Sequence, residues 1–160
     1  MRAGWDSCIL GVCLWGGATP MVHDRTGAGE LTKRRVLIAD DNPQVRRELR
    51  TLLPLAADIK IVGEAADGRE AIRLTQALQP EVVLMDLEMP VLDGYEATRQ
   101  IKACSPSCWV VALTVHGYET ARQRAMQAGV DVFLVKGAAI ESLLVAISAR
   151  PSDPEGLGDP

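Results

Sequence analysis

Aromatic side chains, basic excess and long apolar runs are all scarce in this sequence. Aromatic residues make up 4% of the 160 residues, so the core must be built mainly from Val, Leu, Ile and Ala. Lys and Arg number 17 against 21 Asp and Glu, a net charge of −4, which argues against a surface made for nucleic-acid phosphates. No stretch approaches the run of about 20 apolar residues that a membrane helix needs. The composition therefore predicts one globular domain with no membrane span and no direct binding of nucleic acid.

Cysteine and histidine are too few and too irregularly spaced to indicate a zinc site. The four cysteines are Cys8, Cys13, Cys104 and Cys108, and the chain has two histidines. Neither pair of neighbouring cysteines has the usual spacing of zinc ligands. We expect reduced thiols in a reducing compartment.

The two ends of the chain differ from its middle. Residues 1–34 join an apolar, Gly-rich stretch to a polar, loop-like one. We predict a disordered leader there, or an over-extended start with Met21 or a later codon as the real beginning. A signal peptide, with Arg2 before the apolar run, is the weaker alternative because Asp6 and Trp15 do not suit one. Residues 151–160 are polar and rich in Pro and Gly, which predicts a disordered tail after a domain at 35–150.

Between these ends, short apolar runs alternate with amphipathic segments. The predicted strands are 35–39, 58–63, 82–85, 109–113 and 132–135. Each is followed by apolar residues at helical spacing, and Asp67 with Glu70 and Asp93 with Glu96 have the form of capping boxes. Gly129 is a predicted helix C-cap. This alternation predicts a doubly wound α/β fold with five parallel strands, covered by helices on both faces.

Polar side chains that carry chemistry follow four of the predicted strands. Asp40 and Asp41 follow the first strand, Asp86 the third, Thr114 the fourth and Lys136 the fifth. In such a sheet the functional site lies beyond the carboxyl ends of the strands, so these groups are expected to meet. Any one of them alone is an ordinary loop or capping residue, and the signal is their joint placement.

Three carboxylates that meet repel one another, and a hard divalent cation removes this conflict. Mg²⁺ prefers oxygen ligands and is often bound by one or two carboxylates. Lys136 adds a positive charge and Thr114 a hydrogen-bond donor. These are the groups that phosphoryl transfer needs, and an aspartate is a known covalent nucleophile for it.

The motifs that carry these residues resemble those of the receiver domain of bacterial two-component response regulators, which has the CheY-like fold. The motifs are VLIADDNP, GEAADGREAI, VVLMDLEMPVLDGYEAT, ALTVHG and VFLVKG, and the resemblance covers about 35 to 149. Their wording is most similar to the LuxR/NarL-type subfamily. The resemblance implies a flavodoxin-like (βα)5 sheet with strand order 2-1-3-4-5.

The resemblance also implies roles for individual residues. Asp86 is the expected phosphorylation site. Asp41 and Asp86 are expected to bind Mg²⁺ directly, Asp40 mainly through water, and Glu88 through its backbone carbonyl.

The same resemblance implies the switch and the partners. Lys136 is expected to contact the phosphoryl group, and Thr114 and Phe133 to move on phosphorylation. A sensor histidine kinase or phosphotransfer protein would supply the phosphoryl group in the cytoplasm. A homodimer through the fourth helix, fifth strand and fifth helix is a possible output. The chain would be a signalling phosphoacceptor that catalyses only its own phosphotransfer and dephosphorylation.

Some residues depart from the family pattern. Gly137 follows Lys136 where the family most often has Pro, and Phe133 replaces the usual Tyr. Val115 stands where a small Ala is common, so we expect it to narrow access to Asp86 and slow phosphoryl exchange. His116 and Glu88 lie where the family varies its dephosphorylation rate.

Three other functions remain open from the sequence. One is the receiver part of a LuxR-type transcription factor whose DNA-binding domain is absent from this chain. Another is a dehalogenase-type phosphatase. Such enzymes carry an Asp-x-Asp motif at the end of the first strand, and the adjacent Asp40 and Asp41 of this chain do not match that spacing. The last is a phosphate-independent receiver kept for dimerisation, against which the complete set of acidic, hydroxyl and lysine residues argues.

Overall fold

The computed structural model describes residues 33–149. The predictions on the leader, on Cys8 and Cys13 and on the tail after residue 150 lie outside the described residues. The strands are β1 (Arg34–Ala39), β2 (Ile59–Ala65), β3 (Val82–Asp86), β4 (Trp109–Thr114) and β5 (Val132–Val135). The helices are α1 (Pro43–Ala56), α2 (Gly68–Leu78), α3 (Gly94–Cys104), α4 (Glu119–Ala128) and α5 (Ile140–Ser148).

The five strands form one parallel sheet in the order β2-β1-β3-β4-β5, which confirms the predicted topology. Strand β2 is added on one side of β1, and strands β3 to β5 are added on the other side. The strand order therefore reverses between β1 and β3, and the loops that follow these two neighbouring strands diverge from each other. Strand β2 lies at the sheet edge, and its central residues are only partly buried. This explains why its sequence alternates while those of β1, β3 and β4 are nearly all apolar.

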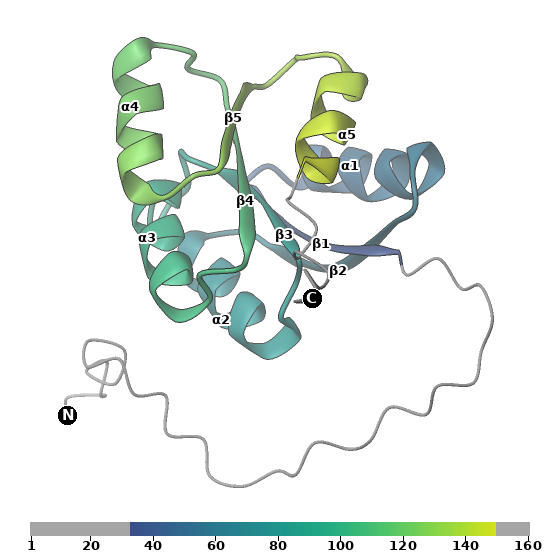
Figure 1. Ribbon diagram of the computed structural model, residues 1–160, viewed down its shortest axis with the longest axis horizontal. Coiled ribbons are helices and arrows are strands. Elements are labelled where there is room, and N and C mark those ends of the chain that lie inside the picture. Colours follow the sequence, from purple (N-terminus) through teal and green to yellow (C-terminus); the bar gives the residue numbers. More distant parts are fainter. Residues whose placement is uncertain (1–32, 150–160) are drawn as a thin grey trace, which may run out of the picture. The chain divides into compact units, whose positions relative to one another are not determined.

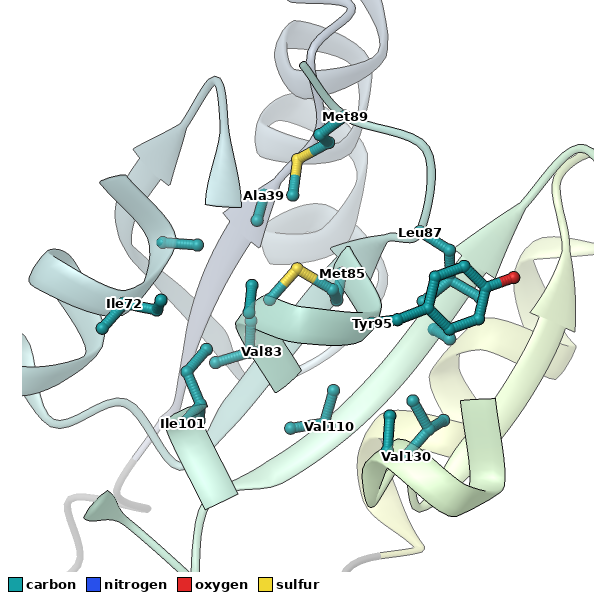
Figure 2. Close-up of a cluster of buried hydrophobic side chains, with 14 of the residues drawn as sticks. Ala39, Ile72, Val83, Met85, Leu87, Met89, Tyr95, Ile101, Val110 and Val130 are labelled. Atoms are coloured by element: carbon teal, nitrogen blue, oxygen red, sulfur yellow. The ribbon is translucent and has the colours of Figure 1, made fainter. Parts of the chain in front are cut away.

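Helices cover both faces of the sheet (Figure 1): α1 and α5 lie on one side, and α2, α3 and α4 on the other. Successive strand residues point to opposite faces. Val36 and Ile38 therefore pack toward α1 and α5, whereas Leu37 and Ala39 pack toward α2 and α3. Figure 2 shows the second of these clusters, in which Val83 and Met85 of β3 share the core with Ile101 of α3. The core is aliphatic as predicted, with Tyr95 as its nearly buried aromatic residue.

Helices α2 and α3 begin at the predicted caps. Asp67 Oδ1 accepts from the N–H of Glu70 at 2.9 Å, and Glu70 reaches back to the N–H of Ala66 at 2.9 Å. Asp93 Oδ1 likewise accepts from the N–H of Glu96 at 2.8 Å. The Glu96 carboxylate instead pairs with Arg99 and Gln100 on its own helix, so only half of the second capping box forms.

Three boundaries differ from the simple apolar pattern. The ladder of hydrogen bonds extends β3 through Asp86 and β4 through Thr114, so both polar residues are the last residues of strands. Helix α1 continues past Pro54 to Ala56. Within residues 33–149, no helix combines the length and the apolar character that crossing a bilayer requires.

Candidate functional site

Two neighbouring strands bring the three aspartates together. Asp40 and Asp41 follow β1, and Asp86 ends β3, which is hydrogen-bonded to β1. One carboxylate oxygen from each aspartate lies within 4.8 Å of the others. Asp40 and Asp86 are 2% and 4% exposed, whereas Asp41 faces solvent. The group therefore has a buried floor and an open side.

Lys136 joins this cluster from the end of β5. Its Nζ lies 2.7 Å from Asp86 Oδ2 and 2.7 Å from Asp40 Oδ2, so a single cation bridges the two buried carboxylates. The backbone N–H of Lys136 donates to the carbonyl of Thr114 at 2.7 Å, which fixes the start of the side chain beside β4. The predicted convergence of Asp40, Asp86 and Lys136 is confirmed in the geometry.

The electrostatics of the cluster follow from burial and from this lysine. Burial raises the pKa of Asp86 despite the opposing hydrogen bonds from Lys136 and from the N–H of Glu88, the latter at 3.1 Å. Burial also acts to lower the pKa of Lys136, but the contacts with Asp40 and Asp86 outweigh it and raise that pKa overall. Lys136 is therefore a stable cation at neutral pH.

The donor set fits a hard divalent cation. Asp40 Oδ2 is buried and lies 2.7 Å from the Lys136 ammonium, an ion pair that partly offsets its charge. Asp40 Oδ1 accepts from the N–H of Asn42 at 2.9 Å, which orients the carboxylate. Two buried carboxylates beside a solvent-exposed one offer the oxygen ligands that Mg²⁺ selects.

Thr114 is fully buried at the end of β4, with β3 on one side and β5 on the other. Its hydroxyl oxygen accepts from the N–H of His116 at 3.2 Å, so the loop after β4 turns back over the hydroxyl. Phe133 lies in β5, partly buried, and packs against the core cluster on the α2–α3–α4 side of the sheet.

Glu88 and His116 meet across the mouth of the site, from the loops after β3 and β4. Glu88 Oε1 lies 2.5 Å from His116 Nδ1, and the imidazole stacks on Tyr118 with ring centroids 5.6 Å apart. Val115, beside them, is 59% exposed. All three side chains predicted to influence access therefore lie on these two loops.

Two residues beside the site, Arg46 and Gly94, were not predicted from the sequence. Arg46 in the first turn of α1 donates to the carbonyl of Asp40 at 2.6 Å, and its Nε lies 3.6 Å from Glu64. A cation at a helix N-terminus opposes the helix dipole, and this unfavourable placement was the available signal. Gly94 lies so close to β3 that an added Cβ would stand 2.0 Å from the carbonyl oxygen of Asp86. No local pattern marks such a long-range contact.

Residues 36–148 match the sequence profile of the response regulator receiver domain. The chain belongs to this family. The receiver is 37% identical over 113 residues to the response regulator GacA of Pseudomonas aeruginosa, covering 71% of this chain and 53% of GacA. It is 40% identical over 112 residues to the response regulator UvrY of Escherichia coli, covering 70% of this chain and 51% of UvrY. The chain thus spans about half the length of these relatives.

Solved structures agree with the family. A LuxR-family two-component response regulator from Aurantimonas superposes with a TM-score of 0.69 at 34% identity, covering 72% of this chain and 82% of that one. The receiver is therefore a signalling domain of the response regulator type, and it is similar to receivers of the LuxR family. This family assignment overturns the phosphatase alternative, because the complete fold and the strand order match receivers.

Proposed function

We propose that this receiver accepts a phosphoryl group on Asp86 in a Mg²⁺-dependent reaction. The observation that carries the proposal is the position of Asp86 at the tip of β3, hydrogen-bonded to Lys136 and within 4.8 Å of two further carboxylates. Because Asp86 is the last residue of a strand and is hydrogen-bonded to Lys136, its carboxylate is held in a fixed position toward an incoming phosphoryl group.

The donor would be a phosphohistidine of a sensor histidine kinase or a phosphotransfer protein. An Asp86 carboxylate oxygen attacks phosphorus, the O–P bond forms and the N–P bond breaks. The imidazole leaves with the electron pair and takes up a proton. Lys136 stays close to the acceptor and pairs with a phosphoryl oxygen, and the Thr114 hydroxyl donates to another after its loop moves inward.

Asp41, Asp86 and the backbone carbonyl of Glu88 would bind Mg²⁺, with Asp40 acting mainly through water. The cation would neutralise charge on the equatorial oxygens of the phosphoryl group. Asp40 keeps one oxygen on the N–H of Asn42 and turns the other toward the cluster, which makes it suitable for orienting a metal-bound water.

Access to Asp86 would be set by Val115, His116 and Glu88. The Glu88–His116 contact joins the two loops that border the site, and Val115 stands beside it. A bulky branched side chain there should slow entry of the phosphodonor and of hydrolytic water. Val115→Ala should therefore speed both phosphorylation and dephosphorylation, and unchanged rates would refute this role.

The signal would leave through protein contacts on the α4–β5–α5 face. Apolar side chains exposed on these elements are Met126, Val135 and Val145, which are 50%, 40% and 68% exposed. Movement of Thr114 and Phe133 would alter this face, and a homodimer is the partner that fits it. We place the receiver in the cytoplasm, where its kinase would present the phosphohistidine.

Intact-mass spectrometry after incubation with acetyl phosphate tests the function. The wild type should gain about 80 Da with Mg²⁺ and nothing without it. Asp86→Ala should gain nothing, whereas Asp58→Ala, an exposed aspartate at the opposite end of the sheet, should behave as wild type. An adduct on Asp86→Ala, or one that ignores Mg²⁺, would refute the proposal.

A second candidate is control of a DNA-binding output domain. The supporting observation is the similarity to LuxR-family regulators, which the chain matches over about half their length. The mass of the natural protein, measured in its own cell extract, distinguishes the candidates. A species close to 160 residues favours a single-domain receiver, and a clearly longer species, of about 210 residues or more as in GacA, favours the transcription factor.

A further inference from the structure

Helix α4 is held to the rest of the receiver by little apolar burial. Its buried residues are Ala125 and Ala128, both in its second half. In the first half, Glu119, Arg122 and Gln123 face solvent. An alanine buries a single methyl group, so this helix gains less from burial than helices that carry Leu or Ile inward.

Arg124 supplies a contact of another kind. Its Nη2 donates to Asp93 Oδ2 at 3.2 Å, and its Cζ lies 4.0 Å from the centroid of the Tyr95 ring. Within residues 33–149, no other α4 side chain makes a hydrogen bond or ion pair to a different element. Burial raises the pKa of Tyr95, so its ring is a neutral phenol whose face attracts the guanidinium.

Both partners of Arg124 lie on a segment that is fixed to the phosphoacceptor. Asp93 is the N-cap of α3, and Tyr95 follows Gly94 in the first turn. Gly94 packs directly on the backbone of Asp86, and its N–H donates to the carbonyl of Leu87 at 3.1 Å. Figure 2 shows Tyr95 beside Leu87 at the edge of the core cluster. A displacement of the backbone at Asp86 and Leu87 would therefore also displace Tyr95, because Gly94 between them is in direct contact with both.

We propose that Arg124 is a positioning residue that couples helix α4 to the segment after Asp86. This inference rests on the proposed function, because it requires that occupation of the Asp86 site displaces this segment. Arg124 transmits that movement by its simultaneous contact with the Asp93 carboxylate and the Tyr95 ring. The coupling route therefore runs outside the sheet, from the β3–α3 loop to α4, in addition to any route through Thr114.

Amide hydrogen exchange of α4 tests the coupling in two stages. Without any phosphoryl mimic, Arg124→Ala should speed exchange of the α4 amides by about 5- to 20-fold, the loss of one cation–π contact and one exposed ion pair. Arg122→Ala is the matched control, since Arg122 lies on the same helix, is exposed and makes no ion pair within the described residues. Equal exchange in Arg124→Ala and Arg122→Ala would overturn the tether.

The second stage compares Mg²⁺ alone with Mg²⁺ and beryllofluoride. The wild type and Arg122→Ala should change their α4 exchange when beryllofluoride binds, and in Arg124→Ala that change should fall to less than half. A merely structural role for Arg124 would raise the baseline but leave the response intact, and this result would overturn the proposal. Tyr95→Phe keeps the ring and should keep the response.

Failure of the proposed function would look different. In that case the wild type would gain no phosphoryl group in the mass measurement, whatever the variant at Arg124. If the wild type is phosphorylated on Asp86 but α4 exchange does not respond, the function stands and the coupling through Arg124 is wrong. Retained Mg²⁺ affinity in Arg124→Ala confirms that the acidic cluster itself is unaltered.

Discussion

Replacing Lys136 with Met should destabilise the receiver in a way that Mg²⁺ reverses. Lys136 Nζ lies 2.7 Å from both Asp40 and Asp86, whose carboxylates are nearly buried. Removing one partner of a buried ion pair costs about 3–5 kcal/mol. Lys136 is 21% exposed and the site opens toward solvent at Asp41, which lowers the cost. We expect Lys136→Met to lose about 2–3 kcal/mol of unfolding free energy at pH 7 without metal.

Urea unfolding with and without Mg²⁺ measures this loss. A cation bound between the carboxylates replaces the missing ammonium, and at ten times its Kd it adds about 1.4 kcal/mol. The gain from Mg²⁺ should be larger in Lys136→Met than in the wild type, because the lysine no longer competes for Asp40 and Asp86. Lys60→Met, an exposed lysine of β2, is the matched control and should change stability by less than about 0.5 kcal/mol.

The pH dependence has a defined sign. The pKa of Lys136 is raised above its ordinary value of 10.5, so its stabilising contribution is complete below that pH and is lost only as the pH rises further. The wild type therefore keeps this contribution throughout the neutral range. In Lys136→Met the penalty should shrink as the pH falls, because burial raises the pKa of Asp86 and favours protonation of that carboxylate. A loss below about 0.5 kcal/mol at pH 7, or a loss that Mg²⁺ leaves unchanged, would refute the reasoning.

Three further predictions concern stability. Burial raises the pKa of Asp86, so folding disfavours its ionised form. The stability cost grows as the pH rises above the unfolded value and is complete above the raised folded value, so Asp86→Asn should be more stable than wild type at pH 7 without metal and equally stable in acid, where Asp86 is protonated. A lower melting temperature of Asp86→Asn at pH 7 would contradict this. Gly94→Ala should lose about 2–3 kcal/mol in urea unfolding, because its Cβ would overlap the carbonyl of Asp86, and a loss under 1 kcal/mol would show that the backbone yields. Gly137 has a left-handed backbone, with φ +93°, and open space where a Cβ would lie. Gly137→Ala should therefore cost about 1 kcal/mol of stability and Gly137→Pro about 3 kcal/mol or more, measured by thermal unfolding. Melting temperatures of both variants equal to that of the wild type would contradict the left-handed backbone.

The sequence determined the elements of this fold because their signals are local. Apolar runs of four to six residues between amphipathic segments favour strands buried on both faces, and the Asp67 and Asp93 caps mark where helices begin. The positions of Asp40, Asp86 and Lys136 directly after such runs also sufficed to predict that they converge, since parallel strands bring their carboxyl ends to one edge. Local chemistry together with one topological rule therefore reached both the sheet and the acidic cluster.

Tertiary structure alone decided which oxygen meets which cation and which helices touch. The bridge of Lys136 between Asp40 and Asp86 depends on the order β1-β3-β4-β5, and the Arg124 contacts depend on how α4 lies against α3. Arg46 and Gly94 became site residues only through packing against the backbones of Asp40 and Asp86. Hydrophobic periodicity says which face of an element is buried, but not which neighbour covers it. Contacts between residues far apart in the chain follow from packing, and packing is set by the whole molecule.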